Sequence, residues 1–137
     1  MGSISTLGQE QQPKVCQLEI SEKGVMSCVG ECPIYYYRDG DNCKEVKGEC
    51  KLVGKTGGKR PGGWDCVCVY NIPGKKCELV VDKVSGIRSC RGECPSLFSS
   101  KKDCEDKKTP DAKFKCELYT YRKSETELIF ECFCVKA

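Results

Sequence analysis

The cysteines constrain this chain more than any other feature, because they occur in two series with the same order and nearly the same spacing. Each series contains a C-x-x-x-C element followed by proline, and each ends in C-x-C. The chain gains or loses residues only between these elements. The pattern indicates an internal duplication. The first series is Cys16, Cys28, Cys32, Cys43, Cys50, Cys66 and Cys68, and the second is Cys77, Cys90, Cys94, Cys104, Cys116, Cys132 and Cys134.

Fourteen of the 137 residues are cysteine, which is the composition of a disulfide scaffold. A unit of about 60 residues with this little apolar material cannot be held together by burial alone. We therefore expect disulfides, an oxidising compartment, and a secreted, extracellular protein. The chain has no histidine, and its cysteines are not paired as C-x-x-C knuckles. We expect neither a metal nor another cofactor.

The formal net charge is only +3; the first repeat is neutral and the second carries a net charge of +2, so neither is the cationic body of a nucleic-acid binder. No apolar run reaches the roughly 20 residues that span a bilayer, so we do not expect integral membrane insertion. Since the first residues are polar, we expect that a secretory leader has been removed. We expect a monomer with an extracellular protein as its partner.

We expect four segments in the chain. Residues 1–14 are polar and aperiodic, which is typical of a disordered tail. Residues 15–70 form the first cysteine-rich repeat, residues 71–75 a linker, and residues 76–137 the second repeat.

Alternation of apolar and polar residues predicts strands. It marks residues 15–20 and 77–81 at the start of each repeat. It also predicts a β-hairpin at the end of each, over residues 115–121 and 128–135 in the second and over 50–53 and 64–69 in the first. A long glycine-rich loop separates the strands of the first hairpin.

The C-x-x-x-C element would place both sulfurs on one face of a helix. The proline after it leaves two alternatives: a short turn that ends at Pro33 or Pro95, or a helix that begins there. The second alternative suits residues 95–108, with Leu97, Phe98 and Cys104 on an inner face. Residues 34–37 instead favour an extended segment. The predicted fold class is small, disulfide-rich α+β, with two tandem repeats, each a short helix or turn stapled to a small antiparallel sheet.

The order Cys, C-x-x-x-C, Gly-x-Cys and C-x-C resembles the defensin-like, cysteine-stabilised αβ family. In the second series Phe114-Lys115-Cys116 lacks the glycine of the third element. The resemblance covers most of residues 16–134 and implies a strand, a helix and a hairpin stapled by disulfides. The pairs that it implies are Cys16–Cys50, Cys28–Cys66, Cys32–Cys68, Cys77–Cys116, Cys90–Cys132 and Cys94–Cys134.

This scheme leaves one cysteine over in each repeat, Cys43 and Cys104. We predict that they pair with each other and clamp the two units together. The alternative is local pairing of Cys43 with Cys50 and of Cys104 with Cys116, which would leave Cys16 and Cys77 over.

Without histidine there is no ordinary Ser-His or Cys-His nucleophile pair, so we expect no catalytic residues and no enzyme. The predicted target-binding residues are Lys55, Lys59, Arg60 and Trp64 in the glycine-rich loop, and Tyr36. The loop could equally be a plain hairpin tip with Trp64 packed back on the sheet. For Tyr36 the favoured alternative is a half-exposed strand residue opposite Tyr35 and Tyr37.

These observations favour a secreted, non-enzymatic binding or inhibitory protein that acts on a protease, receptor or channel. Against a trypsin-like protease, Lys55, Lys59 or Arg60 would be the side chain presented, and Pro61 would resist cleavage after Arg60. The alternatives are a host-defence protein that binds microbial surfaces, as the family resemblance implies, and a structural or storage protein.

Overall fold

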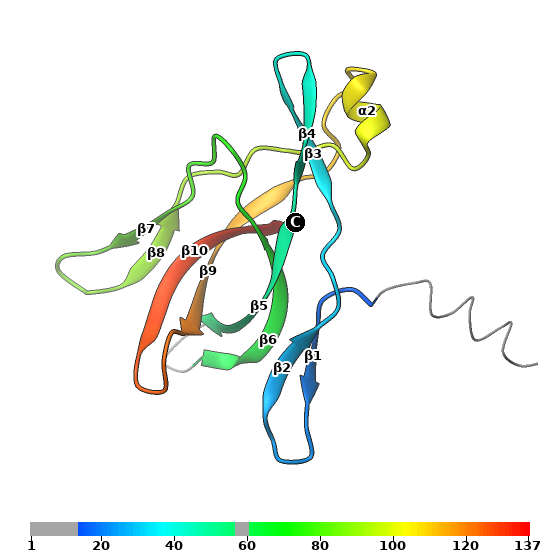
Figure 1. Ribbon diagram of the computed structural model, residues 1–137. Coiled ribbons are helices and arrows are strands. Elements are labelled where there is room, and N and C mark those ends of the chain that lie inside the picture. Colours follow the sequence, from blue (N-terminus) through cyan, green and yellow to red (C-terminus); the bar gives the residue numbers. More distant parts are fainter. Residues whose placement is uncertain (1–13, 57–60) are drawn as a thin grey trace, which may run out of the picture.

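The computed structural model describes residues 14–56 and 61–137, and this part of the chain is mostly β-structure with ten strands and one short helix (Figure 1). Residues 15–70, here the first half, contain β1 (Gln17–Ile20), β2 (Met26–Val29), β3 (Tyr35–Asp39), β4 (Asn42–Val46), β5 (Gly48–Thr56) and β6 (Pro61–Tyr70). Residues 76–137, the second half, contain β7 (Glu78–Val81), β8 (Arg88–Arg91), α2 (Lys101–Glu105), β9 (Phe114–Arg122) and β10 (Leu128–Lys136).

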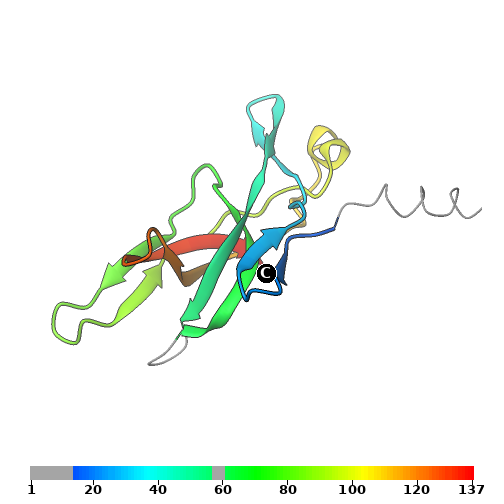
Figure 2. The ribbon, with the colours of Figure 1, turned by 60° about the horizontal axis from the view of Figure 1, so that its bottom comes forward.

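Four strands form a closed barrel in the order β10-β6-β5-β9. The β5–β6 and β9–β10 hairpins are antiparallel and paired along their lengths. Figure 2 shows the two hairpins crossing each other. Two short contacts close the barrel, one between β5 and β9 at Gly54↔Thr120 and Lys55↔Tyr119, and one between β6 and β10 at Tyr70↔Cys134. Because each half supplies one hairpin, neither half closes the barrel alone.

The barrel has a small apolar core of Val53, Val69, Tyr119 and Val135, all buried. These residues are two pairs at matching positions of the two halves. Val53 and Tyr119 each lie three residues after Cys50 or Cys116, and Val69 and Val135 each follow the last cysteine of their series. Strand alternation places the residue after each cysteine of C-x-C on the opposite face from the sulfurs. The barrel core is therefore built from equivalent positions.

A second core lies beside the barrel, and three aromatic rings pack edge to face within it. The ring centroids of Tyr35, Tyr70 and Phe114 lie 5.0–5.3 Å apart, a separation typical of favourable aromatic pairs. Gly48 allows this packing, since a Cβ atom there would lie 2.7 Å from the Tyr70 ring and 2.8 Å from the Cβ atom of Cys32. Phe114 holds the position in the second half that Gly48 holds in the first, so the large residue of one half fills the core.

Seven disulfides use all fourteen cysteines, and this number of disulfides is typical of extracellular proteins. Six lie within one half, and the seventh joins the halves. They coincide with the pairings that the resemblance implies and with the predicted clamp. The bonds are Cys16–Cys50, Cys28–Cys66, Cys32–Cys68, Cys77–Cys116, Cys90–Cys132, Cys94–Cys134 and, between the halves, Cys43–Cys104.

Three two-stranded hairpins project from the barrel: β1–β2, β3–β4 and β7–β8. Figure 1 shows β1–β2 and β7–β8 extending in different directions. Disulfides at the base tie β1–β2 and β7–β8 to the barrel, whereas the disulfide of β3–β4 joins Cys43 to Cys104 in α2. Cys16 and Cys28 anchor the first hairpin, and Cys77 and Cys90 anchor β7–β8.

The predicted α+β class is wrong, because the C-x-x-x-C elements are not helical. Cys28 lies in β2, and the chain then turns at Gly30, whose φ of 101° is outside the range of a right-handed helix. A Cβ atom at Gly30 would collide with the backbone of Lys14 and Val15. Gly92 has a φ of 106° at the matching position. Glycine and the pairing of β2 with β1 therefore override the helical spacing of the cysteines.

The helix predicted over residues 95–108 is also wrong in extent. Leu97 and Phe98 are extended and pair with Ala112 and Tyr36. The helix α2 has only five residues, and its buried Cys104 forms the clamp. Ser100 caps it by accepting a hydrogen bond from the Asp103 amide.

The glycine-rich loop is shorter than expected, because β5 runs on to Thr56 and β6 begins at Pro61. Within the described residues no helix has the length and apolar character needed to cross a membrane.

Candidate binding surfaces

The turn between β7 and β8 is the most exposed apolar feature of the described chain. The Val84 side chain at its tip is 98% exposed, and Val81 and Ile87 beside it are also exposed. Lys83, directly before Val84, adds an exposed cation. A single exposed valine is ordinary on a protein surface. The way in which this turn is held makes it a candidate for recognition.

Hydrogen bonds fix the turn from inside. The Asp82 carboxylate accepts from the amides of Val84 (2.7 Å) and Ser85 (3.0 Å). The Asp82 amide donates to the Ile87 carbonyl, and the Gly86 amide donates to the Asp82 carbonyl. Gly86 supplies the left-handed conformation, with a φ of 75°. The two amide hydrogen bonds hold the pKa of the Asp82 carboxyl below its usual value of 3.8.

The corresponding turn between β1 and β2 presents different side chains. Five residues separate the paired ends Ile20 and Met26, whereas six separate Val81 and Arg88. The shorter turn is closed by Ser21 and presents Glu22 and Lys23 at its tip. The β7–β8 turn is therefore one residue longer than the β1–β2 turn, and it has the apolar Val84 at its tip.

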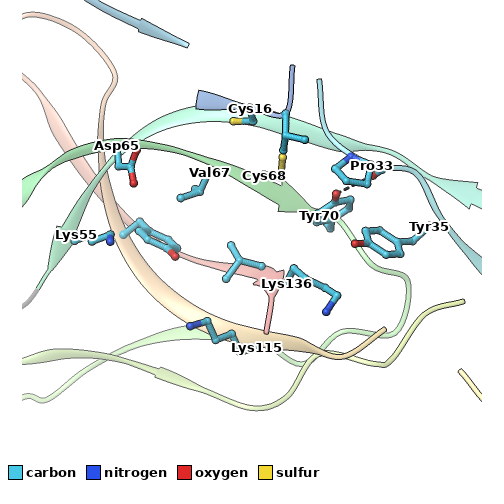
Figure 3. Close-up of a pocket in the computed structure, with 13 residues that line it drawn as sticks. Cys16, Pro33, Tyr35, Lys55, Asp65, Val67, Cys68, Tyr70, Lys115 and Lys136 are labelled. Atoms are coloured by element: carbon cyan, nitrogen blue, oxygen red, sulfur yellow. Dashed lines mark hydrogen bonds between the residues drawn. The ribbon is translucent and has the colours of Figure 1, made fainter. Parts of the chain in front are cut away.

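A cleft of about 420 Å³ lies between the halves, and we call it the seam cleft (Figure 3). In Figure 3, Lys55 lies at one end beside Asp65, and Lys115 and Lys136 lie on the wall opposite Val67 and Cys68. The other lining residues are apolar, aromatic or disulfide-bonded: Val15, Cys16, Pro33, Tyr35, Val67, Cys68, Tyr70, Tyr119 and Val135.

Three lysines and one aspartate line the seam cleft, which gives the lining a net charge of +2. The Lys115 amino group lies 3.4 Å from a Glu117 carboxylate oxygen, and that of Lys136 donates to the main-chain oxygen of Ala137 at 3.3 Å. The Asp65 carboxylate accepts from the Cys66 amide at 2.8 Å. Among the described residues, no carboxylate lies within 4 Å of the Lys55 amino group.

Two tyrosines of the seam cleft, Tyr70 and Tyr119, are weaker acids than a free tyrosine, because burial raises the pKa of each hydroxyl. The buried Tyr70 hydroxyl donates to the Pro33 carbonyl at 2.8 Å. Burial raises the pKa of Tyr70 to about 12, and the neighbouring Tyr35 contributes to this shift. Burial also raises the pKa of Tyr119, and the charges of Glu117 and Asp65 add to it. The lysines of the cleft therefore stand beside two tyrosines that keep their protons at physiological pH.

A second cleft of about 360 Å³ occupies the matching place on the other side, and we call it the opposite cleft. Its charges cancel, because two lysines face two glutamates. Glu49 holds the position that Lys115 holds in the seam cleft, and Tyr70 holds that of Lys136. The opposite cleft is lined by Lys47, Glu49, Val69, Tyr70, Asn71, Lys75, Glu131 and Phe133.

The structure does not gather the predicted target-binding residues into one site. Lys59 and Arg60 lie outside the described residues. Lys55 lies in strand β5 rather than in a loop, and it lines the seam cleft. Tyr36 is half-buried in β3, where its backbone pairs with Glu45 on one side and Phe98 on the other.

Trp64 lies in β6, half-buried, and lines a separate hollow of about 420 Å³ with Val25, Met26, Leu52 and Arg122. The Arg122 guanidinium lies 6.0 Å from the centre of its ring, at the outer limit of a cation–π contact. Trp64 is thus partly packed on the sheet and partly open to the surface.

Sequence reasoning missed Val84, Lys115 and Lys136. A signal for Val84 was present, since the segment between the first two cysteines is one residue longer in the second series. The lysines gave no signal, because they contribute to a cleft only when the two hairpins cross.

Three groups of cysteine sulfurs lie close enough together to resemble metal sites. Every one of these sulfurs belongs to a disulfide, and thiolate is the form that binds metals. The oxidised protein therefore offers no thiolate at these positions.

Comparison of the chain with protein-family models, with curated proteins and with solved structures found no match.

Proposed function

We propose that this chain is a secreted, non-enzymatic binding protein that recognises an extracellular protein through the β7–β8 turn. The observation that carries the proposal is the 98% exposure of Val84 on a turn held by the Asp82 carboxylate. Small disulfide-rich proteins commonly present recognition loops on a rigid scaffold. The lack of histidine and of free thiols supports a role without catalysis.

Rigidity is what makes an exposed valine useful in recognition. Burying one valine side chain in a partner contributes roughly 2 kcal/mol. A flexible loop would lose much of this contribution to the entropy of ordering. Here the turn is already ordered by its own hydrogen bonds and anchored at its base by Cys77 and Cys90.

The charges around the turn indicate the chemistry of the partner. Asp82 is occupied by two backbone amides, and the Arg88 guanidinium lies 4.0 Å from the centre of the Phe130 ring. Lys83 is then the cation directly beside Val84. A fitting partner has a small apolar pocket with a carboxylate at its rim.

Inhibition of a trypsin-like protease is a separate form of the binding function, because it would act through the glycine-rich loop and not through the β7–β8 turn. Lys59 and Arg60 are the residues that would be presented, since Lys55 lies in a strand. Inhibition of trypsin at micromolar concentration, lost on Arg60→Ala, would support this form, and its absence would remove it.

The alternative function is host defence through microbial surfaces. It is less favoured, because the tip of the matching β1–β2 turn is polar and the net charge is only +3. Membrane binding by projecting turns gains from several apolar tips and from attraction to anionic lipid.

The test compares Val84→Asp with Val25→Asp, a matched change at an exposed valine of the first hairpin. Immobilised wild-type protein should capture a saturable partner from extracellular fluid of the source organism. Val84→Asp should weaken that partner's binding by at least about tenfold, and Val25→Asp should leave it unchanged.

A partner whose affinity is insensitive to Val84→Asp would contradict the proposal. If the triple change of Lys59, Arg60 and Trp64 to alanine abolished binding instead, the site would be the glycine-rich loop. Salt-sensitive binding to anionic vesicles without any protein partner would favour the host-defence function.

A further inference from the structure

We propose that the seam cleft binds a small organic anion, with its acidic group held by lysines and its apolar or aromatic body on the cleft floor. The ligand class is a carboxylate, sulfonate or phosphate attached to a ring or a short alkyl chain. This site is separate from the β7–β8 turn and does not depend on the proposed protein partner.

The lining of the seam cleft carries more positive than negative charge. Lys55, Lys115 and Lys136 face a single carboxylate, Asp65, which already accepts a hydrogen bond from the backbone. Among the described residues, the one side-chain carboxylate within 4 Å of any of these three amino groups is that of Glu117. With Asp65 in the lining and Glu117 paired to Lys115, two side-chain carboxylates stand against three lysines. An anion entering the cleft would compensate the positive charge that remains.

The rest of the lining is mainly apolar and aromatic. Val67, Tyr119 and Val135 come from facing strands of the two hairpins, and Tyr35 and Tyr70 extend the aromatic surface. A volume of about 420 Å³ lies within the range of small-molecule sites. A bare inorganic ion would leave this apolar surface uncovered, so we infer a ligand that has a body as well as a charge.

The opposite cleft provides an internal comparison. Five of its eight lining residues hold positions that match residues of the seam cleft on the same two hairpins, and its two glutamates balance its two lysines. Glu49 replaces the cation that Lys115 provides, and Tyr70 replaces Lys136. The same framework therefore distinguishes the two clefts by charge, and only the seam cleft is expected to select anions.

The experiment titrates the isotope-labelled, fully oxidised protein by NMR with naphthalene-2-sulfonate. Naphthalene-2-sulfonamide serves as the neutral counterpart with the same ring, and sodium sulfate as the anion without a body. The sulfonate should shift the amide signals of Val67, Tyr119 and Val135 saturably. The sulfonamide should bind about tenfold more weakly, the loss of one charge-assisted contact. Sulfate should cause no saturable shift at the same concentration.

The double variant Lys115→Gln, Lys136→Gln should weaken sulfonate binding by about tenfold or more. The matched control Lys47→Gln, Lys75→Gln removes two lysines from the opposite cleft and should leave the affinity unchanged. All four lysines lie outside the buried cores. Intact mass and a dispersed NMR spectrum will establish that each variant keeps the fold and its seven disulfides.

Three results would overturn the proposal. The first is equal affinity for the sulfonate and the sulfonamide, because charge would then play no part. The second is equal weakening by both lysine pairs, which would indicate diffuse attraction to the whole surface. The third is the absence of saturable shifts at the seam-cleft amides up to about 1 mM sulfonate, a concentration that corresponds to binding of about −4 kcal/mol.

Discussion

The backbones of Tyr36 and Phe98 exchange two hydrogen bonds of 2.9 Å, and these two residues hold the same position in the two halves. Each lies four residues after the second cysteine of its C-x-x-x-C element. The bond between Cys43 and Cys104 likewise joins matching positions. Such self-complementary contact is the geometry of a two-fold symmetric dimer interface. The two halves therefore pack as two subunits of a homodimer would, within one chain.

The barrel also closes through a contact between matching positions of the two halves. Gly54 pairs with Thr120, and each lies four residues after the fifth cysteine of its series. The buried Thr120 hydroxyl donates to the Gly54 carbonyl at 3.1 Å. These contacts define an approximate two-fold axis through the barrel, and the two clefts lie at related places around it.

Truncating the barrel core should destabilise the whole chain. Val53 is 0% exposed, so we expect Val53→Ala to lower the free energy of unfolding by about 1–3 kcal/mol. Guanidinium unfolding under non-reducing conditions measures the change. Val25→Ala is the matched control, because Val25 is 62% exposed and its truncation should change stability by less than about 0.5 kcal/mol. Equal effects of the two substitutions would contradict the assignment of Val53 to the core.

The clamp should stabilise the arrangement of the halves. The Cys43–Cys104 bond spans 61 residues of sequence. A loop of this length corresponds to about 4 kcal/mol in the chain-entropy treatment of disulfides. We expect the double change of Cys43 and Cys104 to serine to lower the unfolding midpoint and to leave the other six bonds intact. An unchanged midpoint would mean that the clamp does not constrain the unfolded chain.

The turn that presents Val84 should respond to acid. The folded pKa of Asp82 is below the ordinary value of 3.8, because its ionised form accepts two amide hydrogen bonds. Its stabilising contribution is therefore complete above the unfolded pKa and is lost as the pH falls through the lower folded pKa. NMR titration should show the Val84 and Ser85 amides shifting together with a midpoint below 3.8, and Asp82→Asn should abolish that shift. A midpoint at or above 3.8 would contradict the proposed hydrogen bonds.

Tyr70 should resist ionisation in the folded protein. Its pKa is raised to about 12 by burial. Folding stability should accordingly decline as the pH rises above 10, where an unfolded tyrosine ionises and the folded one does not. Ultraviolet titration of tyrosinate should contain a component near pH 12 that Tyr70→Phe removes. If the variant instead lost a component near pH 10, Tyr70 would be exposed.

Much of the covalent frame could be predicted from the sequence. The spacing of the cysteines, read through the family resemblance, anticipated the pairs that the structure contains, and strand alternation located the hairpins that become β5–β6 and β9–β10. Both signals are local or nearly so. The C-x-C element, for example, places two sulfurs on one face of a strand whatever else the chain does.

The helix prediction failed because its spacing signal was ambiguous. C-x-x-x-C fits a helix, but it also fits a strand followed by a turn. Gly30 and Gly92 favour the turn, and the decisive contact is with Lys14 and Val15, which lie outside the element. The seam cleft was unpredictable for a related reason. Lys55 and Lys115 line one cavity only because the hairpins of the two halves cross.

The most direct test of this account is a disulfide map of the oxidised protein, obtained by proteolysis and mass spectrometry without reduction. The crossing hairpins, the seam cleft and the anchored β7–β8 turn all depend on the connectivity between and within the halves. We predict a peptide pair joined through Cys43 and Cys104, together with the six bonds within the halves. A peptide that joins Cys43 to Cys50 would contradict the account, because each half would then fold around its own bonds with no covalent link to the other.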